Sequence, residues 1–269
     1  MRVYLPLQPP ALQNETSDSH YRYREFLPSN ELESYVACYW TLDANVSERN
    51  HLHRIIPDGC VDIIFDLNAS SSTNAAFAVG LMTTYETINL TVNQSLFGIR
   101  FFSDTARRLI RYPVSELMSY HVFLEEIWGS EGKFIAEEVT SANNRSEMIE
   151  RVETLLIRLL LQNESNSDQL LQSSMKYMYA SQGTISVRML SEKLGYSERK
   201  VRRTFQKELG ISPKELLDIL RFQYMLREMK KGVPSRLTDL ALNYGFYDQP
   251  HFNRNFKRFY GLTPGQVFT

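Results

Sequence analysis

One stretch near the C-terminus guides the interpretation of this chain: Leu190-Ser191-Glu192-Lys193-Leu194-Gly195-Tyr196-Ser197. A similar stretch follows fifty residues later: Leu240-Ala241-Leu242-Asn243-Tyr244-Gly245-Phe246. Beyond the glycine the offset becomes fifty-one, so the second copy has one extra turn residue. The later pairs are Ser197 and Asp248, Arg203 and Arg254, Phe205 and Phe256, Gly210 and Gly261, Ser212 and Thr263, and Pro213 and Pro264. Each copy has the pattern of a helix-turn-helix.

In the first copy, Ser197 is placed to cap a helix whose inward side carries Val201, Phe205 and Leu209. These residues recur at intervals of four and so share one helix face. The opposite face is polar, and in a helix-turn-helix that face enters the major groove, where Arg donates paired hydrogen bonds to guanine. The predicted DNA-binding residues here are Arg199, Arg202, Arg203 and Gln206.

In the second copy, Asp248 is the capping residue and Pro250 falls in the first turn, where a missing N–H costs nothing. Three phenylalanines, at 252, 256 and 259, are predicted to face inward. The predicted DNA-binding residues are Gln249, His251, Asn253 and Arg254. A single arginine of either copy could be an ordinary solvated charge, but clustering on two equivalent faces favours DNA contact.

Between the copies, residues 213–231 predict one long helix. Ser212-Pro213-Lys214-Glu215 forms a capping box with proline at the first helical position. Apolar residues on more than one face predict a helix packed between two subdomains. At 1.5 Å per residue it would span about 28 Å, which would set the two recognition helices roughly one DNA turn apart.

The charge distribution follows the repeat. Residues 183–269 contain 16 Lys and Arg against 8 Asp and Glu, a net +8, while the remainder contains 14 against 23, a net −9. A basic C-terminal domain beside an acidic N-terminal one is expected when only one domain approaches phosphate.

The N-terminal half predicts a small β-barrel followed by helices. Period-2 alternation or β-rich composition predicts strands at 61–67, 76–82, 87–92 and 97–102. Residues 1–30 are predicted to form a loosely packed N-terminal arm. Short helices are predicted at 104–111, 115–121 and 122–128, and a long one at 146–162. The apolar stripe of the long helix could pack on its own domain or form the seam of a homodimer.

The polar residues 163–167 predict a linker. The expected domains are therefore 1–162, a sensor or dimerisation domain, and 168–269, a DNA-binding domain, giving an α+β chain.

The C-terminal part resembles the DNA-binding domain of the AraC/XylS family of bacterial transcription regulators. Besides the repeat quoted above, the resemblance rests on Gly210-Ile211-Ser212-Pro213-Lys214, His251-Phe252-Asn253-Arg254-Asn255-Phe256-Lys257-Arg258 and Gly261-Leu262-Thr263-Pro264. It implies DNA binding near promoters, usually with activation through RNA polymerase, and base contacts from the arginines and polar residues named for each copy. Leu190-Ser191 stands where the family usually has Leu-Ala, and serine should still fit.

The N-terminal part is similar to a sensor-type domain, usually a cupin-like barrel, that precedes this DNA-binding domain in some members. The similarity rests on residues 54–65, from Arg54-Ile55-Ile56-Pro57-Asp58-Gly59 to Phe65, and on Phe97-Gly98-Ile99-Arg100-Phe101. It implies control by a small molecule but identifies no ligand and no pocket residue.

Other chemistry was weighed against this interpretation. The chain has 269 residues, two cysteines and no apolar run near the roughly 20 residues of a membrane span. It shows no signal-peptide pattern, so the cytoplasm is the expected location. His51 and His53 near Cys60 hint at a metal site, but surface histidines before a turn are the favoured explanation, and Cys38 and Cys60 are expected to be buried thiols.

No catalytic motif is present, so an enzyme with an appended DNA-binding domain is the weaker hypothesis, and no cofactor is expected. The favoured function is a sequence-specific regulator, an activator controlled by a small molecule. The alternative is a regulator controlled by a protein partner or by self-association through 146–162.

Overall fold

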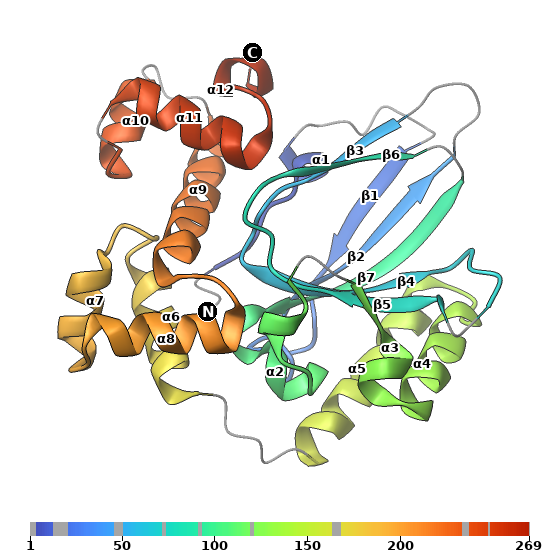
Figure 1. Ribbon diagram of the computed structural model, residues 1–269. Helices are drawn as coiled ribbons and strands as arrows, with labels where there is room; N and C mark the ends of the chain where they lie inside the picture. The colour runs from blue at the N-terminus through green and yellow to red at the C-terminus, as the bar shows by residue number, and fades with distance from the viewer. Residues whose placement is uncertain are drawn as a thin grey trace.

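The structure is a computed structural model that describes residues 4–12, 21–45, 51–71, 74–90, 93–118, 121–162, 168–232, 237–246 and 248–268. A β-rich N-terminal part and a helical C-terminal part lie side by side (Figure 1). This confirms the predicted α+β class. Within the described residues, no helix has both the length and the apolar character needed to cross a membrane.

The N-terminal part is built on an antiparallel sheet of six strands in the order β1-β2-β7-β4-β5-β8. These strands are β1 Tyr21–Phe26, β2 Val36–Ala44, β4 Cys60–Asp66, β5 Ala76–Val79, β7 Gln94–Phe102 and β8 His121–Phe123. A separate two-stranded sheet pairs β3, His51–Ile55, with β6, Glu86–Leu90. The strands predicted from 61, 76, 87 and 97 are confirmed as β4, β5, β6 and β7, although residues 91–92 lie outside the described part.

One face of the large sheet packs against helices. The helices of this half are α1 Pro9–Leu12, α2 Ser103–Ile110, α3 Leu124–Trp128, α4 Ser130–Thr140 and α5 Arg145–Gln162. Figure 1 shows α3, α4 and α5 along the same face of the sheet. The alternation in β4 sends Val61, Ile63 and Phe65 to this face, where none of the three is exposed. Tyr39 of β2 stacks on Phe97 and donates a hydrogen bond to Glu153 of α5.

The other face of the large sheet carries an ionised cluster. Arg100 of β7 is 4% exposed and forms ion pairs with Asp58 and Asp62 at 3.1 and 3.0 Å. The indole N–H of Trp40 donates to Asp62 at 3.0 Å. Burial raises the pKa of Asp62, and the Arg100 guanidinium opposes that rise. A Cβ at position 98 would lie 2.0 Å from the Trp40 ring, so glycine there allows the indole to lie across the strand.

Two expectations for this half are wrong, and one helix was missed. Residues 1–30 are not a loose arm throughout, since 21–26 form the edge strand β1 and Tyr4 and Leu7 are buried. The helix predicted at 115–121 is wrong, because Val114–Glu116 form a 3-10 turn and His121 begins β8, which pairs with β5; residues 119–120 lie outside the described part. The helix predicted at 122–128 begins only at Leu124, since 122 and 123 belong to β8. Helix α4 was not anticipated at all. In β1 and β8, pairing with a neighbouring strand overrides local propensity.

The apolar stripe of α5 packs within its own domain. Met148, Val152, Leu155, Leu156 and Leu159 are all buried there. Of the two uses that the sequence left open for this stripe, the intramolecular one is observed in the structure.

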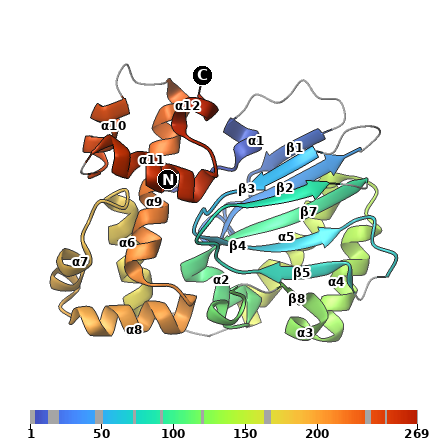
Figure 2. The same cartoon turned by 45° about the horizontal axis from the view of Figure 1, so that its top comes forward.

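The C-terminal part contains seven helices in its described residues (Figure 2). They are α6 Gln169–Ala180, α7 Val187–Leu194, α8 Glu198–Leu209, α9 Pro213–Lys231, α10 Leu237–Asn243, α11 Gln249–Tyr260 and α12 Pro264–Val267. The predicted linker at 163–167 lies outside the described residues. The predicted capping box opens α9, with Ser212 and Glu215 each bonded to the other's backbone.

The two parts share a continuous core. Gln223 of α9 bonds both the N–H and the carbonyl of Leu7, at 2.8 and 3.1 Å, and donates to the Pro57 carbonyl at 2.8 Å. Tyr4 stacks on Tyr179 of α6 with ring centroids 5.0 Å apart. The N-terminal segment is thus held between the sheet and α9, which links the two parts through buried contacts.

Asp104 lies where α2 meets α6 and makes this junction sensitive to pH. Burial raises its pKa from 3.8 to about 6. Because the folded state then binds the proton more tightly than the unfolded state, stability falls as pH rises from about 4 to about 6 and does not recover above that.

We therefore expect Asp104→Asn to unfold at higher denaturant concentration than the natural chain at pH 7.5, by about 1–3 kcal/mol in free energy. The difference should shrink towards pH 4.5, where the carboxyl is protonated. Chemical denaturation at both pH values measures it, and an equal shift at the two pH values would contradict the assignment.

Candidate DNA-binding site

The first helix-turn-helix consists of α7 and α8. Ser186 and Ser197 cap these helices, accepting hydrogen bonds from the N–H groups of Met189 at 3.1 Å and Lys200 at 3.3 Å. Gly195 between them has φ of 70°, a left-handed conformation that glycine adopts without strain. The inward side chains Val201, Phe205 and Leu209 are buried as predicted.

The predicted DNA-binding residues of this copy all lie exposed on α8. Arg202 is paired with Glu198 one turn earlier, at 3.0 Å, and Gln206 donates to the Gly210 carbonyl at 3.0 Å. Arg199 and Arg203 are exposed on the same helix. The face therefore presents three guanidinium groups to solvent, one of them already oriented by a carboxylate.

The second helix-turn-helix consists of α10 and α11. Asp248 caps α11 by accepting from the His251 N–H at 2.7 Å. Phe252, Phe256 and Phe259 are buried as predicted. Their rings form an aromatic core that includes Phe222 of α9, whose centroid lies 5.6 Å from Phe256 and 5.0 Å from Phe259.

The second recognition face is less open than the first. Gln249 and Arg254 are exposed, while His251 and Asn253 are half-buried. The His251 ring meets the ring of Phe246 edge-on, with centroids 5.6 Å apart. The structure brings the four predicted residues together on α11, and their contact with DNA stays a prediction.

Helix α9 joins the two copies as a rigid element. Its 19 residues correspond to about 28 Å. Arg221 links both sides of it, since it donates to the Gly183 carbonyl before α7 at 3.4 Å and lies 5.6 Å from the Phe246 ring centroid beside α11. Both helix-turn-helix units thus contact one common helix.

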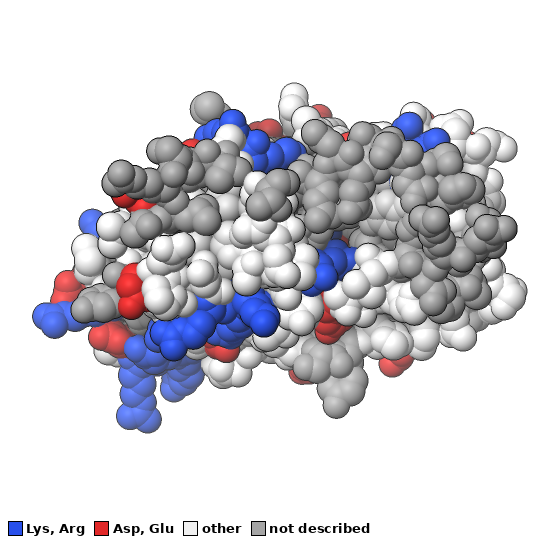
Figure 3. All heavy atoms as spheres, turned by 90° about the horizontal axis from the view of Figure 1, so that it is seen from above, with Lys and Arg blue, Asp and Glu red and all other residues white. Residues whose placement is uncertain are grey.

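Positive charge gathers on the helical part of the molecule. Figure 3 shows Lys and Arg concentrated on the side occupied by the C-terminal helices. Besides the arginines named above, the exposed cations of the two recognition helices are Lys200, Lys207, Lys257 and Arg258. Such a surface attracts the phosphate backbone of DNA.

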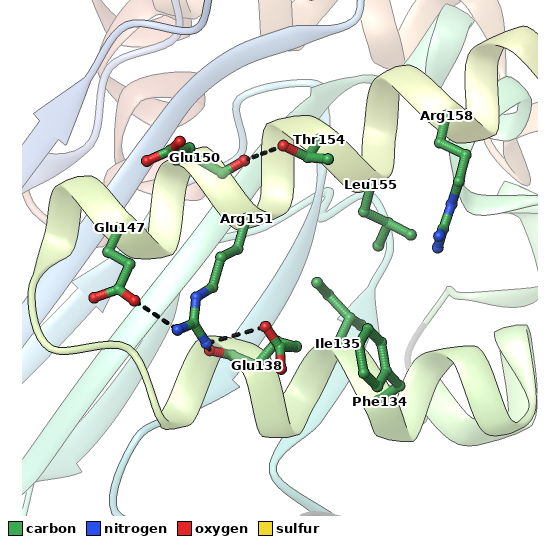
Figure 4. Close-up of a pocket in the computed structure, with 9 residues that line it drawn as sticks. All are labelled: Phe134, Ile135, Glu138, Glu147, Glu150, Arg151, Thr154, Leu155 and Arg158. Atoms are coloured by element: carbon green, nitrogen blue, oxygen red, sulfur yellow. Dashed lines mark hydrogen bonds and ion pairs between the residues drawn. The ribbon is translucent and has the colours of Figure 1, made fainter.

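The described residues also form grooves away from this face. A groove of about 360 Å³ lies between α4 and α5 (Figure 4). Phe134 and Leu155 line it, and Arg151 crosses it to pair with Glu138 and Glu147. Among the described residues, no three His, Cys, Asp or Glu side chains are grouped to hold a metal. The ring of His53 is hydrogen-bonded to Tyr21, and the side chain of His51 is not described.

Both cysteines are buried and free, as expected. Ser191, at the position where the resembling family usually has alanine, is 4% exposed and donates its hydroxyl to the Arg188 carbonyl at 2.8 Å. The serine is therefore accommodated within the first helix-turn-helix.

Sequence reasoning missed two features of the site. The pairing of Glu198 with Arg202 follows from their spacing of four on one helix and was accessible in principle. The attachment of both recognition helices to the β-rich part was not accessible. Glu208 of α8 pairs with Arg107 of α2 at 2.5 Å, and Arg54 of β3 donates to the Tyr260 carbonyl at 2.6 Å. These partners are separated by 101 and 206 residues.

Comparison with known proteins agrees with this geometry. Residues 190–269 match a family described as a helix-turn-helix domain, and residues 24–123 match a domain of unknown function (DUF6597). The HTH-type transcriptional regulator MtrA of Neisseria gonorrhoeae is 34% identical over 70 residues, which span 26% of this chain and 23% of that regulator. The chain thus aligns with less than a quarter of the length of this curated relative.

Solved structures of ToxT from Vibrio cholerae have a similar extent. One is 14% identical with a TM-score of 0.42, covering 93% of this chain and 98% of that one. Another, of wild-type ToxT bound to an unsaturated fatty acid, is 12% identical with a TM-score of 0.40 and covers 93% and 95% of the two chains.

Two helix-turn-helix units on a shared helix, with exposed basic recognition faces, define a DNA-binding domain. More particularly, the helix-turn-helix match over residues 190–269 and the similarity to a transcriptional regulator support the resemblance of this domain to those of AraC/XylS-type regulators.

Proposed function

We propose that the protein is a sequence-specific regulator of bacterial transcription that acts in the cytoplasm, where the chromosome lies. Residues 168–269 bind double-stranded DNA, and residues 1–162 control that binding. The observation that carries this proposal is the pair of equivalent recognition faces on α8 and α11, both fixed to α9. The length of α9, about 28 Å, suits recognition helices that enter two successive major grooves on one side of a duplex.

In this proposal the contacts with DNA bases and with the phosphates beside them come from Arg199, Arg202, Arg203 and Gln206 in the first copy, and from Gln249, His251, Asn253 and Arg254 in the second. Exposed guanidinium groups suit guanine, and the amides of Gln and Asn suit adenine. The half-burial of His251 and Asn253 supports a smaller contribution from the second copy.

The first copy should supply more of the salt-dependent affinity, since its face is denser in arginine. We expect Arg199→Ala with Arg202→Ala to reduce the slope of log affinity against log salt by about 1–2, because each lost phosphate neutralisation removes roughly 0.9. Arg254→Ala alone should change the slope by no more than about 1.

The measurement is fluorescence anisotropy over a salt series, on a duplex selected by the natural protein from a random library. Arg158→Ala on α5 is the matched control, because it removes an exposed arginine far from both recognition helices. An unchanged slope in the Arg199→Ala, Arg202→Ala double variant would refute this division of labour.

We further propose that the protein activates transcription through RNA polymerase and that a small molecule bound by the N-terminal domain controls it. The continuous core between the two parts supports such control, since a change in the β-rich part reaches α9 through Gln223. Screening ligands by thermal shift tests it, because a ligand that binds only the folded state raises the melting temperature.

The alternative is control by a protein partner or by self-association through residues 146–162. The buried stripe of α5 leaves its outer side for that role, where Leu161 is 82% exposed. Sedimentation of the natural chain and of Leu161→Glu tests control by self-association. A dimer that dissociates in the variant would favour self-association, and a monomer in both proteins would exclude it.

A further inference from the structure

The strand β3 touches the second recognition helix. Arg54 donates from Nη1 to the carbonyl of Tyr260, the last residue of α11. Its guanidinium also lies over the rings of Tyr260 and Tyr85, at 5.7 and 5.4 Å from their centroids. A cation is favoured at the C-terminus of a helix, where carbonyl groups concentrate negative potential, and over aromatic faces.

The fit at this contact is close. A Cβ at position 261 would lie 2.2 Å from Arg54 Nη1 and 2.6 Å from the Tyr85 ring. Gly261 also has φ of 85° as the residue that ends α11. The glycine that corresponds to Gly261 in the first copy, Gly210, is enclosed in the same way by Ser115 and Met118, which follow α2. Both recognition helices therefore end against the β-rich part.

The two recognition helices are attached to elements that differ in how firmly they pack in the fold. The first recognition helix is held by Arg107 of α2, a helix packed in the main core with Ala106, Leu109 and Ile110 buried. The second packs on α9 and is held to the β-rich part by β3, which in the described residues pairs only with β6. Residues 86–89 of β6 are exposed and only Leu90 is buried. A two-stranded sheet of this kind has little stability of its own.

Neighbouring residues of β3 face opposite ways, as successive residues of a strand do. Arg54 reaches α11, while His53 turns to the large sheet and shares a hydrogen bond of 2.8 Å with the Tyr21 hydroxyl of β1. Burial lowers the pKa of His53 to about 4, so its ring is neutral at physiological pH. One short strand thus contacts β1 of the large sheet with one side chain and a recognition helix with the next.

We propose that the two-stranded sheet β3–β6 is a lever: a displacement of its inner face at His53 is transmitted by Arg54 to α11 and changes the position of the second recognition helix relative to the first. The first helix-turn-helix stays fixed on α2 and serves as the reference. The lever is a regulatory device for the proposed DNA-binding function and rests on it, but the lever itself is a structural property that is measured without DNA.

The test is a distance measurement between spin labels on the full chain. Lys200→Cys and Lys257→Cys place labels on exposed positions of α8 and α11, and the natural Cys38 and Cys60 are buried and remain unlabelled. We expect one narrow distance distribution in this background. Arg54→Ala should broaden or shift it, and Arg54→Lys should restore part of the narrow distribution because the cation is kept.

A second label pair supplies the reference. Lys133→Cys on α4 with Lys200→Cys reports on the first copy, and its distribution should stay unchanged in Arg54→Ala. A change in both pairs would mean general loosening and would overturn the lever. Arg158→Ala is the control that should alter neither pair.

Tyr21→Phe tests the inner face, because it removes the hydroxyl that His53 contacts and keeps the ring. It should broaden the α8–α11 distribution as Arg54→Ala does. If Arg54→Ala has an effect and Tyr21→Phe has none, Arg54 is a static attachment and the lever is refuted. If neither has an effect, β3 does not position α11. Thermal melts confirm that each variant is folded. Failure of the natural chain to bind DNA would refute the proposed function and leave the distance result standing.

Discussion

Replacing Arg100 with Met is expected to lower the free energy of unfolding at pH 7 by about 3–5 kcal/mol. Arg100 is 4% exposed, and its guanidinium compensates Asp58 and Asp62 on the same sheet face. Without it the two carboxylates remain in a desolvated site with no cation to offset their charge. Removing one partner of a buried ionic cluster costs far more than the cluster itself contributes.

The loss should depend on pH in a defined direction. Burial already raises the pKa of Asp62, and removal of Arg100 takes away the main influence that opposes the rise. The Asp62 carboxyl of Arg100→Met is then protonated in the folded state at a higher pH than in the unfolded state, so the penalty shrinks as pH falls from 7 to 5.

Urea denaturation at the two pH values measures this effect. Arg158→Met is the matched control, since its ion pair with Glu131 is exposed and should contribute less than about 1 kcal/mol. A loss below about 1 kcal/mol in Arg100→Met, or one that is equal at both pH values, would show that the cluster is not ionised as described.

The second large effect concerns the aromatic core of the second helix-turn-helix. Phe256→Ala should destabilise the C-terminal part by about 3–5 kcal/mol. Phe256 is fully buried, and its ring contacts those of Phe222, Phe252 and Tyr260. The truncation leaves a cavity between α9 and α11, so it should also weaken the attachment of α11 to its support.

Hydrogen exchange followed by mass spectrometry locates this loss. Peptides from α11 should lose protection in Phe256→Ala, while peptides from the large sheet keep it. Phe256→Leu retains most of the volume and should show a smaller loss. Uniform loss of protection across the chain would indicate one cooperative unit and would contradict a separate second subdomain.

The repeat explains why so much of the C-terminal part was predictable. Caps, glycine turns and inward residues recur at one spacing, so each copy supports the interpretation of the other. Ser197 and Asp248 both cap as predicted, and Phe205 and Phe256 are both fully buried. Local signals of this kind depend only on residues within a few turns of one another.

The N-terminal part was predictable only where alternation was strong. Strand β4 alternates cleanly and was identified, whereas β1 is an edge strand of polar and aromatic residues whose register depends on β2. The contacts of Arg54 and Gln223 join residues that are distant in sequence, so no local sequence pattern predicts these contacts. Individual arginines of the recognition faces were identified, but the half-burial of His251 and Asn253 emerged only from packing.

The central claim is that α8 and α11 both read DNA. The most direct measurement is the affinity of Arg203→Ala and Arg254→Ala, which alter equivalent positions of the repeat, for a duplex selected by the natural protein and for an unrelated duplex. We predict that each change costs about 1–3 kcal/mol on the selected duplex and less on the unrelated one, with Arg158→Ala unchanged on both. Full affinity for the selected duplex in both Arg203→Ala and Arg254→Ala would contradict the account.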